Sequence, residues 1–155
     1  VMFFEQKTLY ATKSEVTSKE PIPLGKGRIV REGKDVTIVT YAKQVLDAEE
    51  AAKKLAADGI EAEVIDIRSL YPLDKDMIAQ SIAKTHKAIV VTEETRRGGY
   101  GGEISAIIGE EMFDNLDAPV ARIGALNTPV PFAPNLEDVY LPNATDIVLA
   151  AKKMF

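Results

Sequence analysis

The chain of 155 residues has no cysteine, no tryptophan and a single histidine. The lack of cysteine excludes disulfide bonds and thiolate-bound metals. One histidine without cysteine also leaves no recognisable set of metal ligands. His86 falls between an expected helix and an expected strand, which favours a helix-end residue over a catalytic base. We therefore expect no catalytic residue and no metal-binding residue.

Basic residues and long apolar runs are also scarce. The 19 Lys and Arg are outnumbered by 24 Asp and Glu, so the net charge is −5. Such a chain has no basic excess to pair with nucleic-acid phosphates. No apolar run approaches the roughly 20 residues of a membrane span, and no secretion signal is visible. We expect neither a nucleic-acid nor a membrane partner, and a cytoplasmic location.

What the sequence does contain is a regular alternation of strand and helix patterns. The β-branched run "VTIVTY" is typical of a strand buried on both faces. Asp74 is a candidate helix N-cap, and Asn143 with Asp146 a candidate capping pair. Alternation predicts an α/β fold, a three-layer α/β/α domain with a mostly parallel sheet. The expected strands are 36–41, 62–67, 88–92 and 120–124, and the expected helices 44–59, 74–85, 101–113 and 144–155.

The remaining segments lack this regularity. Residues 1–10 read as a short strand, 11–27 as an extended polar linker, and 125–142 as a proline-rich irregular stretch. An apolar strand with no upstream partner indicates a piece of a longer protein. We therefore divide the chain into the end of a preceding domain plus a linker, residues 1–27, and an α/β domain, residues 28–155.

A glycine-rich turn, "ETRRGGYGGEI", joins the third expected strand to the next helix. Strand-to-helix turns of this kind hold phosphates in many α/β proteins. Here Gly99 and Gly101 supply two positions of the dinucleotide fingerprint, but Ile104 stands at the third. Glu93 and Glu94 just before the turn would repel a phosphate. The pattern favours tight backbone turning and predicts no cofactor-binding residue.

Charged residues lie at the carboxyl ends of two expected strands that follow one another along the chain. Asp66 and Arg68 follow one strand, and Glu93 and Glu94 end the next. Because strand carboxyl ends carry function in α/β proteins, these residues could form a charged cleft. The alternative is an exposed cluster of ion pairs.

Several segments, taken in order, resemble one family. These are "MFFE", "GKDVTIVTYAKQV", "AEVIDIRSLYPLD", "VVTEETRRGGYGGEISAIIGEEMFDNLDAPVARIG" and "TPVPFAPNLEDVYLPN". They resemble the C-terminal half of the beta subunit of thiamine-diphosphate-dependent 2-oxo acid dehydrogenases, which act on pyruvate, branched-chain 2-oxo acids or acetoin. The resemblance covers nearly the whole chain and implies a domain like the C-terminal domain of transketolase. Within the family, the sequence is more similar to the bacterial acetoin and pyruvate enzymes.

The resemblance implies a role in assembly. The parent enzyme would decarboxylate its substrate on thiamine diphosphate and pass the acyl group to lipoyl. Thiamine diphosphate and magnesium would be held by the alpha subunit and by a missing N-terminal domain, so this fragment alone would be inactive. The implied partners are the alpha subunit, a second beta subunit and the subunit-binding domain of the acyltransferase core.

The resemblance also suggests two sets of contact residues. A basic subunit-binding domain would need acidic groups and the carboxylate of Phe155 if that residue is the native end. The candidates are Phe155, Glu137, Asp138, Asp114 and Asp117. The alternative is a solvated acidic face. The glycine turn is expected to contact a neighbouring domain or subunit through Glu93, Glu94, Gly98, Gly99, Gly101 and Gly102, or else to turn within this domain.

Two other parents remain open from the sequence. A transketolase or deoxyxylulose-phosphate synthase would share the fold, but "TPVPFAPNLEDVYLPN" argues against it. The chain could also be a stand-alone interaction module. The apolar "VMFFE" start argues against this, because it is typical of the tail of a missing domain.

Overall fold

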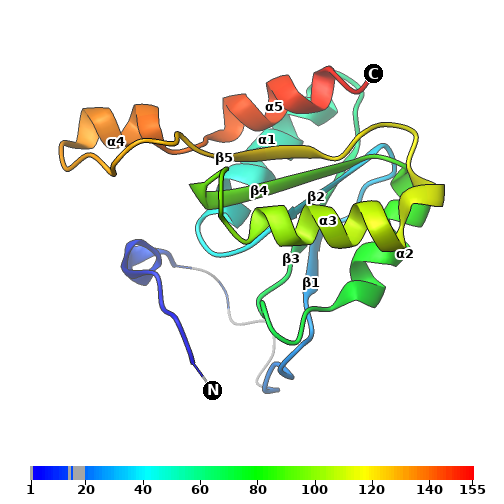
Figure 1. Cartoon of the computed structure of the whole chain (residues 1–155), viewed down its shortest axis with the longest axis horizontal. Helices are drawn as coiled ribbons and strands as arrows, with labels where there is room; N and C mark the ends of the chain where they lie inside the picture. Colours follow the sequence, from blue (N-terminus) through cyan, green and yellow to red (C-terminus); the bar gives the residue numbers. More distant parts are fainter. Residues whose placement is uncertain (1, 14, 16–19) are drawn as a thin grey trace.

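A computed structural model describes residues 2–13, 15 and 20–155 of the chain. Figure 1 shows a sheet between two layers of helices. The strands are β1 (Arg28–Arg31), β2 (Val36–Thr40), β3 (Ala62–Asp66), β4 (Ala88–Thr95) and β5 (Ala121–Ala125). The helices are α1 (Gln44–Ala57), α2 (Lys75–Thr85), α3 (Gly101–Glu111), α4 (Pro134–Tyr140) and α5 (Ala144–Lys152), with short 3-10 helices η1 (Lys7–Ala11) and η2 (Phe113–Asn115).

The sheet has the strand order β1-β3-β2-β4-β5. The three pairs that join β2, β3, β4 and β5 are parallel, whereas β1 pairs antiparallel with β3. The chain moves from β2 to β3 through α1, then crosses back past β2 to reach β4 through α2. This reversal requires helices on both faces when crossovers are right-handed. The predicted three-layer α/β/α fold with a mostly parallel sheet is confirmed.

Two apolar cores lie on the two faces of the sheet. One joins β2 and β3 to α1 and α5, with Leu55 and Ile147 fully buried. The other joins the opposite face to α2 and α3, with Ile78, Ile82 and Ile104 fully buried. All five residues of β2 are buried, as expected for the central strand of a covered parallel sheet.

The predicted helix-capping residues are confirmed. The Asp74 carboxylate accepts a hydrogen bond from the Met77 backbone N–H and caps α2. Asn143 and Asp146 form a reciprocal capping box at the start of α5. His86 ends α2 in the left-handed conformation, with φ of 58°. Its Nδ1 lies 3.0 Å from the Asn115 carbonyl oxygen, so it is a helix-end residue.

The strand predicted over residues 1–10 is wrong for its described part. Residues 2–6 form no strand, and Lys7–Ala11 form the 3-10 helix η1. Met2, Phe3 and Phe4 are exposed and have no strand beside them, so the backbone lacks the partner that a ladder requires. Val1, and residues 14 and 16–19 of the expected linker, lie outside the described residues.

Two further elements were not predicted. The short strand β1 carries arginine at both ends and gains its order by pairing with the edge of β3. Helix α4 begins with Pro134 at its first turn, where a proline needs no hydrogen-bond partner. The expected helix over 101–113 is also shorter, because α3 ends at Glu111 and Phe113 starts η2.

Candidate docking and subunit-contact surfaces

The carboxyl edge of the sheet is where an α/β protein ordinarily binds a ligand. The connection after β2 leads toward β3, and the connection after β4 leads toward β5. Ligands of open α/β sheets sit where such connections diverge. In this chain the divergence lies between the residues after β2 and the glycine turn after β4, so these residues decide what the edge can hold.

Glu94 occupies the start of helix α3 at this edge. Its Oε1 accepts a hydrogen bond from the Gly101 backbone N–H at 3.3 Å. Its two carboxylate oxygens also accept from the Tyr41 hydroxyl at 2.8 and 2.9 Å. Burial, followed by the hydrogen bond and charge of Glu94, raises the pKa of Tyr41 above its usual value of 10.0. A carboxylate of the chain thus takes the place that an anion takes at such helix starts.

Close packing explains why the turn is rich in glycine. A Cβ on Gly99 would lie 2.3 Å from the Glu94 Cγ and 2.6 Å from the Thr95 carbonyl oxygen. A Cβ on Gly101 would lie 2.9 Å from Thr92. Gly98 has open space around it but a φ of +79°, which glycine adopts at little cost. These three glycines fold the turn against its own strand and around Glu94.

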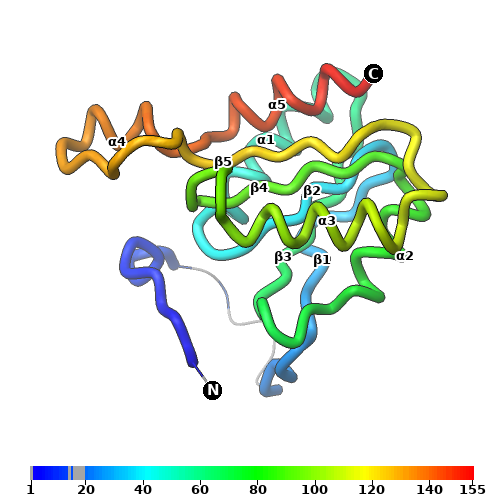
Figure 2. The backbone as a smooth tube through the Cα atoms, in the orientation of Figure 1, coloured from blue at the N-terminus to red at the C-terminus, as the bar shows by residue number. Residues whose placement is uncertain are grey.

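The N-terminal segment covers the same edge through Gln6. The Gln6 Oε1 accepts a hydrogen bond from the Lys43 backbone N–H at 2.8 Å, and its Nε2 donates to the Glu93 Oε2 at 2.5 Å. Gln6 therefore bridges the residues that follow β2 to the end of β4. Figure 2 shows η1 beside this end of the sheet.

These residues do not fit a diphosphate or its metal. The helix start that would face a phosphate is bonded to Glu94, and Gln6 bridges Lys43 to Glu93 beside it. Within residues 2–13, 15 and 20–155, no group of three or more histidine or acidic residues is placed to hold a metal ion. Asp66 pairs with Arg68 at 3.5 Å, whereas Glu93 bonds to Gln6 and Glu94 to Tyr41.

The five predicted docking residues fall into two groups at opposite ends of the molecule. Asp117 donates its backbone N–H to the His86 carbonyl oxygen, beside the start of β4. The Lys87 Nζ lies 4.6 Å from the centre of the Phe155 ring. Asp114 belongs to η2. These three residues lie at the amino end of the sheet, whereas Glu137 and Asp138 lie on α4 beyond the carboxyl end (Figure 1).

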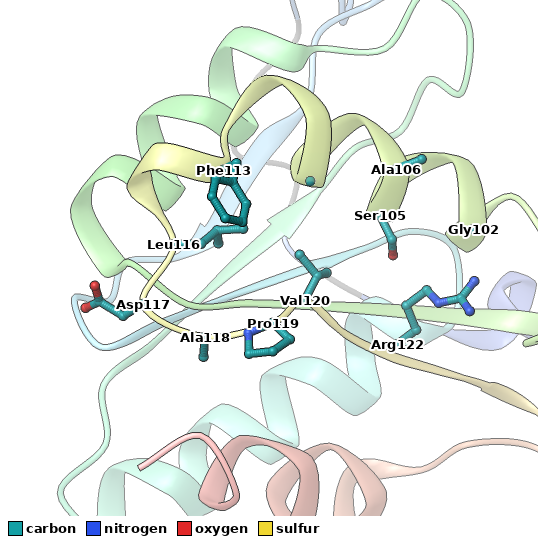
Figure 3. A pocket seen from close by; sticks show the side chains of 11 residues that line it. Gly102, Ser105, Ala106, Phe113, Leu116, Asp117, Ala118, Pro119, Val120 and Arg122 are labelled. Carbon is teal, nitrogen blue, oxygen red and sulfur yellow. The ribbon is translucent and has the colours of Figure 1, made fainter.

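An open groove runs from the first group along the seam between α3 and β5. Its volume is about 650 Å³. Phe113 and Leu116 give it an apolar end beside Asp117, and Arg122 stands at the other end (Figure 3). The Phe113 side chain is 70% exposed. A groove with an exposed aromatic ring beside a carboxylate suits a partner that presents both apolar and basic groups.

The comparison with known families bears on what these surfaces serve. A family model described as the C-terminal domain of transketolase matches residues 25–147. The chain belongs to the transketolase C-terminal domain family. Among the described residues of this transketolase C-terminal domain, no helix is long and apolar enough to cross a bilayer.

Two curated relatives are beta subunits. The chain is 51% identical over 149 residues to the beta subunit of acetoin:2,6-dichlorophenolindophenol oxidoreductase of Bacillus subtilis, covering 96% of the chain and 44% of that subunit. It is 43% identical over 155 residues to the beta subunit of the pyruvate dehydrogenase E1 component of Rickettsia felis, covering 99% and 48%. The chain thus spans less than half the length of these relatives.

A solved structure confirms the fold of the transketolase C-terminal domain. The chain matches an inactive beta4 tetramer of a split-gene transketolase with a TM-score of 0.74 and 32% identity, over 91% of this chain and 45% of that chain. Because identity to the beta subunits is higher, the resemblance seen in the sequence is confirmed.

Three contacts at these surfaces were missed from the sequence. The Tyr41 hydroxyl donates to the carboxylate of Glu94, Gln6 bridges two strand ends, and the exposed Phe113 ring lines the groove. The position of Tyr41 at a strand end was the one available signal, because side chains there meet at the sheet edge. Gln6 and Phe113 lay in segments predicted as a strand and a helix, which hid their roles.

Proposed function

We propose that this chain is the assembly and partner-docking domain of the beta subunit of a pyruvate or acetoin dehydrogenase, acting in the cytoplasm. The observation that carries the proposal is the identity of 51% and 43% to two such beta subunits across nearly the whole chain. The parent enzyme cleaves a 2-oxo acid or acetoin on thiamine diphosphate and passes the acyl group to lipoyl.

In this proposal thiamine diphosphate and magnesium bind outside the chain. The bonding of Glu94 to the start of α3 supports this, because it fills the anion-binding position with a fixed negative charge. Calorimetric titration of the folded chain with thiamine diphosphate and Mg²⁺ should give no heat of binding. Saturable binding, or any decarboxylation by the pure chain, contradicts this division of labour.

The carboxyl edge is the proposed contact with the alpha subunit and with the rest of the beta subunit. Leu70 and Tyr71 are exposed there, and Tyr71 is 96% exposed. The Tyr100 hydroxyl donates to the Leu70 carbonyl oxygen at 2.5 Å, which joins their loop to the glycine turn. A contact through the turn would use this combined surface, including the predicted residues Glu93, Glu94, Gly98, Gly99, Gly101 and Gly102.

The amino end is the proposed docking site for the subunit-binding domain of the acyltransferase. Asp114, Asp117 and Phe155 lie at this end, with the apolar groove of Phe113 beside them. Because α4 lies beyond the opposite end of the sheet, one small partner does not span both groups (Figure 1). We therefore separate Glu137 and Asp138 from this docking site.

A calorimetric titration with a subunit-binding domain from a matching acyltransferase tests the docking site. We expect binding that weakens with salt and falls about tenfold or more in the Asp114→Asn/Asp117→Asn variant. The Glu137→Gln/Asp138→Asn variant is the matched control and should bind as the parent chain does. Equal loss in both variants, or no loss in either, contradicts the placement at the amino end.

A transketolase is the second candidate parent. The fold match to the split-gene transketolase supports it, although at 32% identity against 51% for the acetoin enzyme subunit. A transketolase domain should not bind an acyltransferase, so the same titration separates the two parents.

A further inference from the structure

Residues 126–142 form an arm that projects from the carboxyl end of the sheet. Figures 1 and 2 show α4 at the far end of this arm, clear of both helix layers. Two hydrogen bonds hold the base of the arm: the Leu126 backbone N–H donates to the Tyr140 carbonyl oxygen at 3.3 Å, and the Gln44 side chain donates to the Pro142 carbonyl oxygen at 3.2 Å.

The arm exposes apolar side chains that no described residue of the chain covers. Its exposed apolar residues are Leu126, Val130, Phe132, Leu136 and Val139. Phe132 is fully exposed, with a relative exposure of 102%. A contiguous set of this kind marks a surface that another protein covers. Glu137 and Asp138 lie among these residues and are exposed as well.

A basic hollow of about 810 Å³ lies at the base of the arm, along the edge strand β5. Arg96 and Arg97 of the glycine turn and Arg122 of β5 line it, opposite residues 139–142. Asp146 also lines it, but its carboxylate is bonded to the Asn143 backbone N–H in the capping box. The hollow is thus a positively charged surface on a chain of net charge −5.

The charges of the hollow and of the arm have no ion-pair partner among the described residues. Among the described residues, none of the three arginines lies within ion-pair distance of a carboxylate. The same holds for Glu137 and Asp138 within that part of the chain, and neither lines the hollow. The arm thus carries two acidic residues that do not enter the basic hollow at its own base.

We infer that the arm of a second copy of this chain occupies the arginine hollow, and that the exchange is reciprocal. A two-fold dimer requires one surface that is complementary to itself. An acidic, apolar arm beside a basic, apolar-walled hollow meets this requirement, because each copy offers the group that the other lacks. The inference deepens the proposed function, since it names the surface through which a second beta subunit would be held.

Charge reversal tests this exchange by sedimentation equilibrium of the full 155-residue chain. We expect the parent chain to dimerise. The Arg96→Glu/Arg97→Glu variant should have an acidic hollow and an acidic arm. The Glu137→Arg/Asp138→Arg variant should have a basic hollow and a basic arm. Each should dimerise on the order of 100-fold more weakly, because like charges then face each other. An equimolar mixture should form heterodimers, since both exchanges are then between opposite charges.

The control is the Lys34→Glu/Lys53→Glu variant, which changes the net charge as the arginine reversal does, on exposed residues outside the arm and the hollow. It should dimerise as the parent chain does. A parent chain that stays monomeric, reversals that do not weaken the dimer, or a mixture that does not recover it overturns the inference. A monomeric parent chain would assign the arm to another part of the beta subunit or to a different subunit. None of these results alters the acyltransferase titration, which tests residues at the opposite end.

Discussion

The hydroxyl of Tyr41, directly after the central strand β2, donates to both carboxylate oxygens of Glu94 on the neighbouring strand β4. Glu94 in turn accepts from the backbone at the start of α3. The strand-to-helix turn is therefore closed by a carboxylate of the chain itself. This relationship gives the glycine turn a structural role within the domain and leaves its outer face, with Arg96 and Arg97, available to a neighbour.

A double-mutant cycle measures the bond between Tyr41 and Glu94. We expect Tyr41→Phe and Glu94→Ala each to lower the free energy of unfolding, with a coupling energy of about 1–2 kcal/mol, because the acceptor is charged. Urea unfolding of the four proteins gives the coupling. Additive losses would show that the two side chains do not stabilise the turn through each other.

Alkaline stability should also depend on Tyr41. Burial and Glu94 raise the pKa of Tyr41 in the folded state above the unfolded value of 10.0. The contribution of the protonated Tyr41 hydroxyl to the free energy of unfolding is therefore complete below about pH 10. It is lost as the pH rises toward the pKa of the folded state. The free energy of unfolding should fall between about pH 9.5 and pH 11 less steeply in Tyr41→Phe than in the parent chain. Tyr71→Phe, which alters an exposed ring, is the control and should keep the parent slope.

Alanine at three glycines should separate close packing from backbone strain. Gly99→Ala should lower the free energy of unfolding by about 2 kcal/mol or more, because its Cβ would meet the backbone of Thr95. Gly98→Ala should cost about 1 kcal/mol from its positive φ alone. Gly109→Ala, in open space within α3, should stabilise by about 0.5–1 kcal/mol. Thermal unfolding ranks them, and a Gly99→Ala variant as stable as Gly98→Ala contradicts the packing.

The buried carboxylate of Glu63 should be the costliest single polar group to remove. It accepts from Ser81 Oγ at 2.5 Å and from the Gly33 backbone N–H at 3.2 Å, and it pairs with Lys84. Glu63→Ala should lower the free energy of unfolding by about 3 kcal/mol or more, since the buried Ser81 hydroxyl loses its acceptor and Lys84 loses the buried partner of its ion pair. Glu110→Ala, at an exposed site, should change it by less than about 0.5 kcal/mol. Similar losses by chemical denaturation would show that Glu63 does not hold this network.

The core could be predicted because its signals are local. The β-branched run of β2 and the apolar spacing of α1 and α2 depend only on neighbours along the chain. Asp74 and Asn143 cap helices within three residues of themselves, so their roles could also be read directly. The same holds for His86 at the end of α2.

The missed features depend on contacts far apart in sequence. Strand β1 is ordered by β3, and Gln6 reaches Glu93 across 87 residues. No local pattern specifies either contact. The division of the docking acids into two groups likewise follows from the direction of the arm after β5, which a proline-rich segment did not reveal. Helix α4 was hidden for the same reason, since prolines suggested an irregular stretch.

The most direct test of the account is a chimera. The matching part of the Bacillus subtilis acetoin oxidoreductase beta subunit, about 44% of its length, would be replaced by this chain. The chimera would be purified with the alpha subunit of that enzyme, and its acetoin-dependent reduction of dichlorophenolindophenol would be measured. If the chain is the assembly domain of such a subunit, the chimera should copurify with the alpha subunit and retain activity that depends on thiamine diphosphate. A folded chimera that binds no alpha subunit and shows no activity contradicts the central claim.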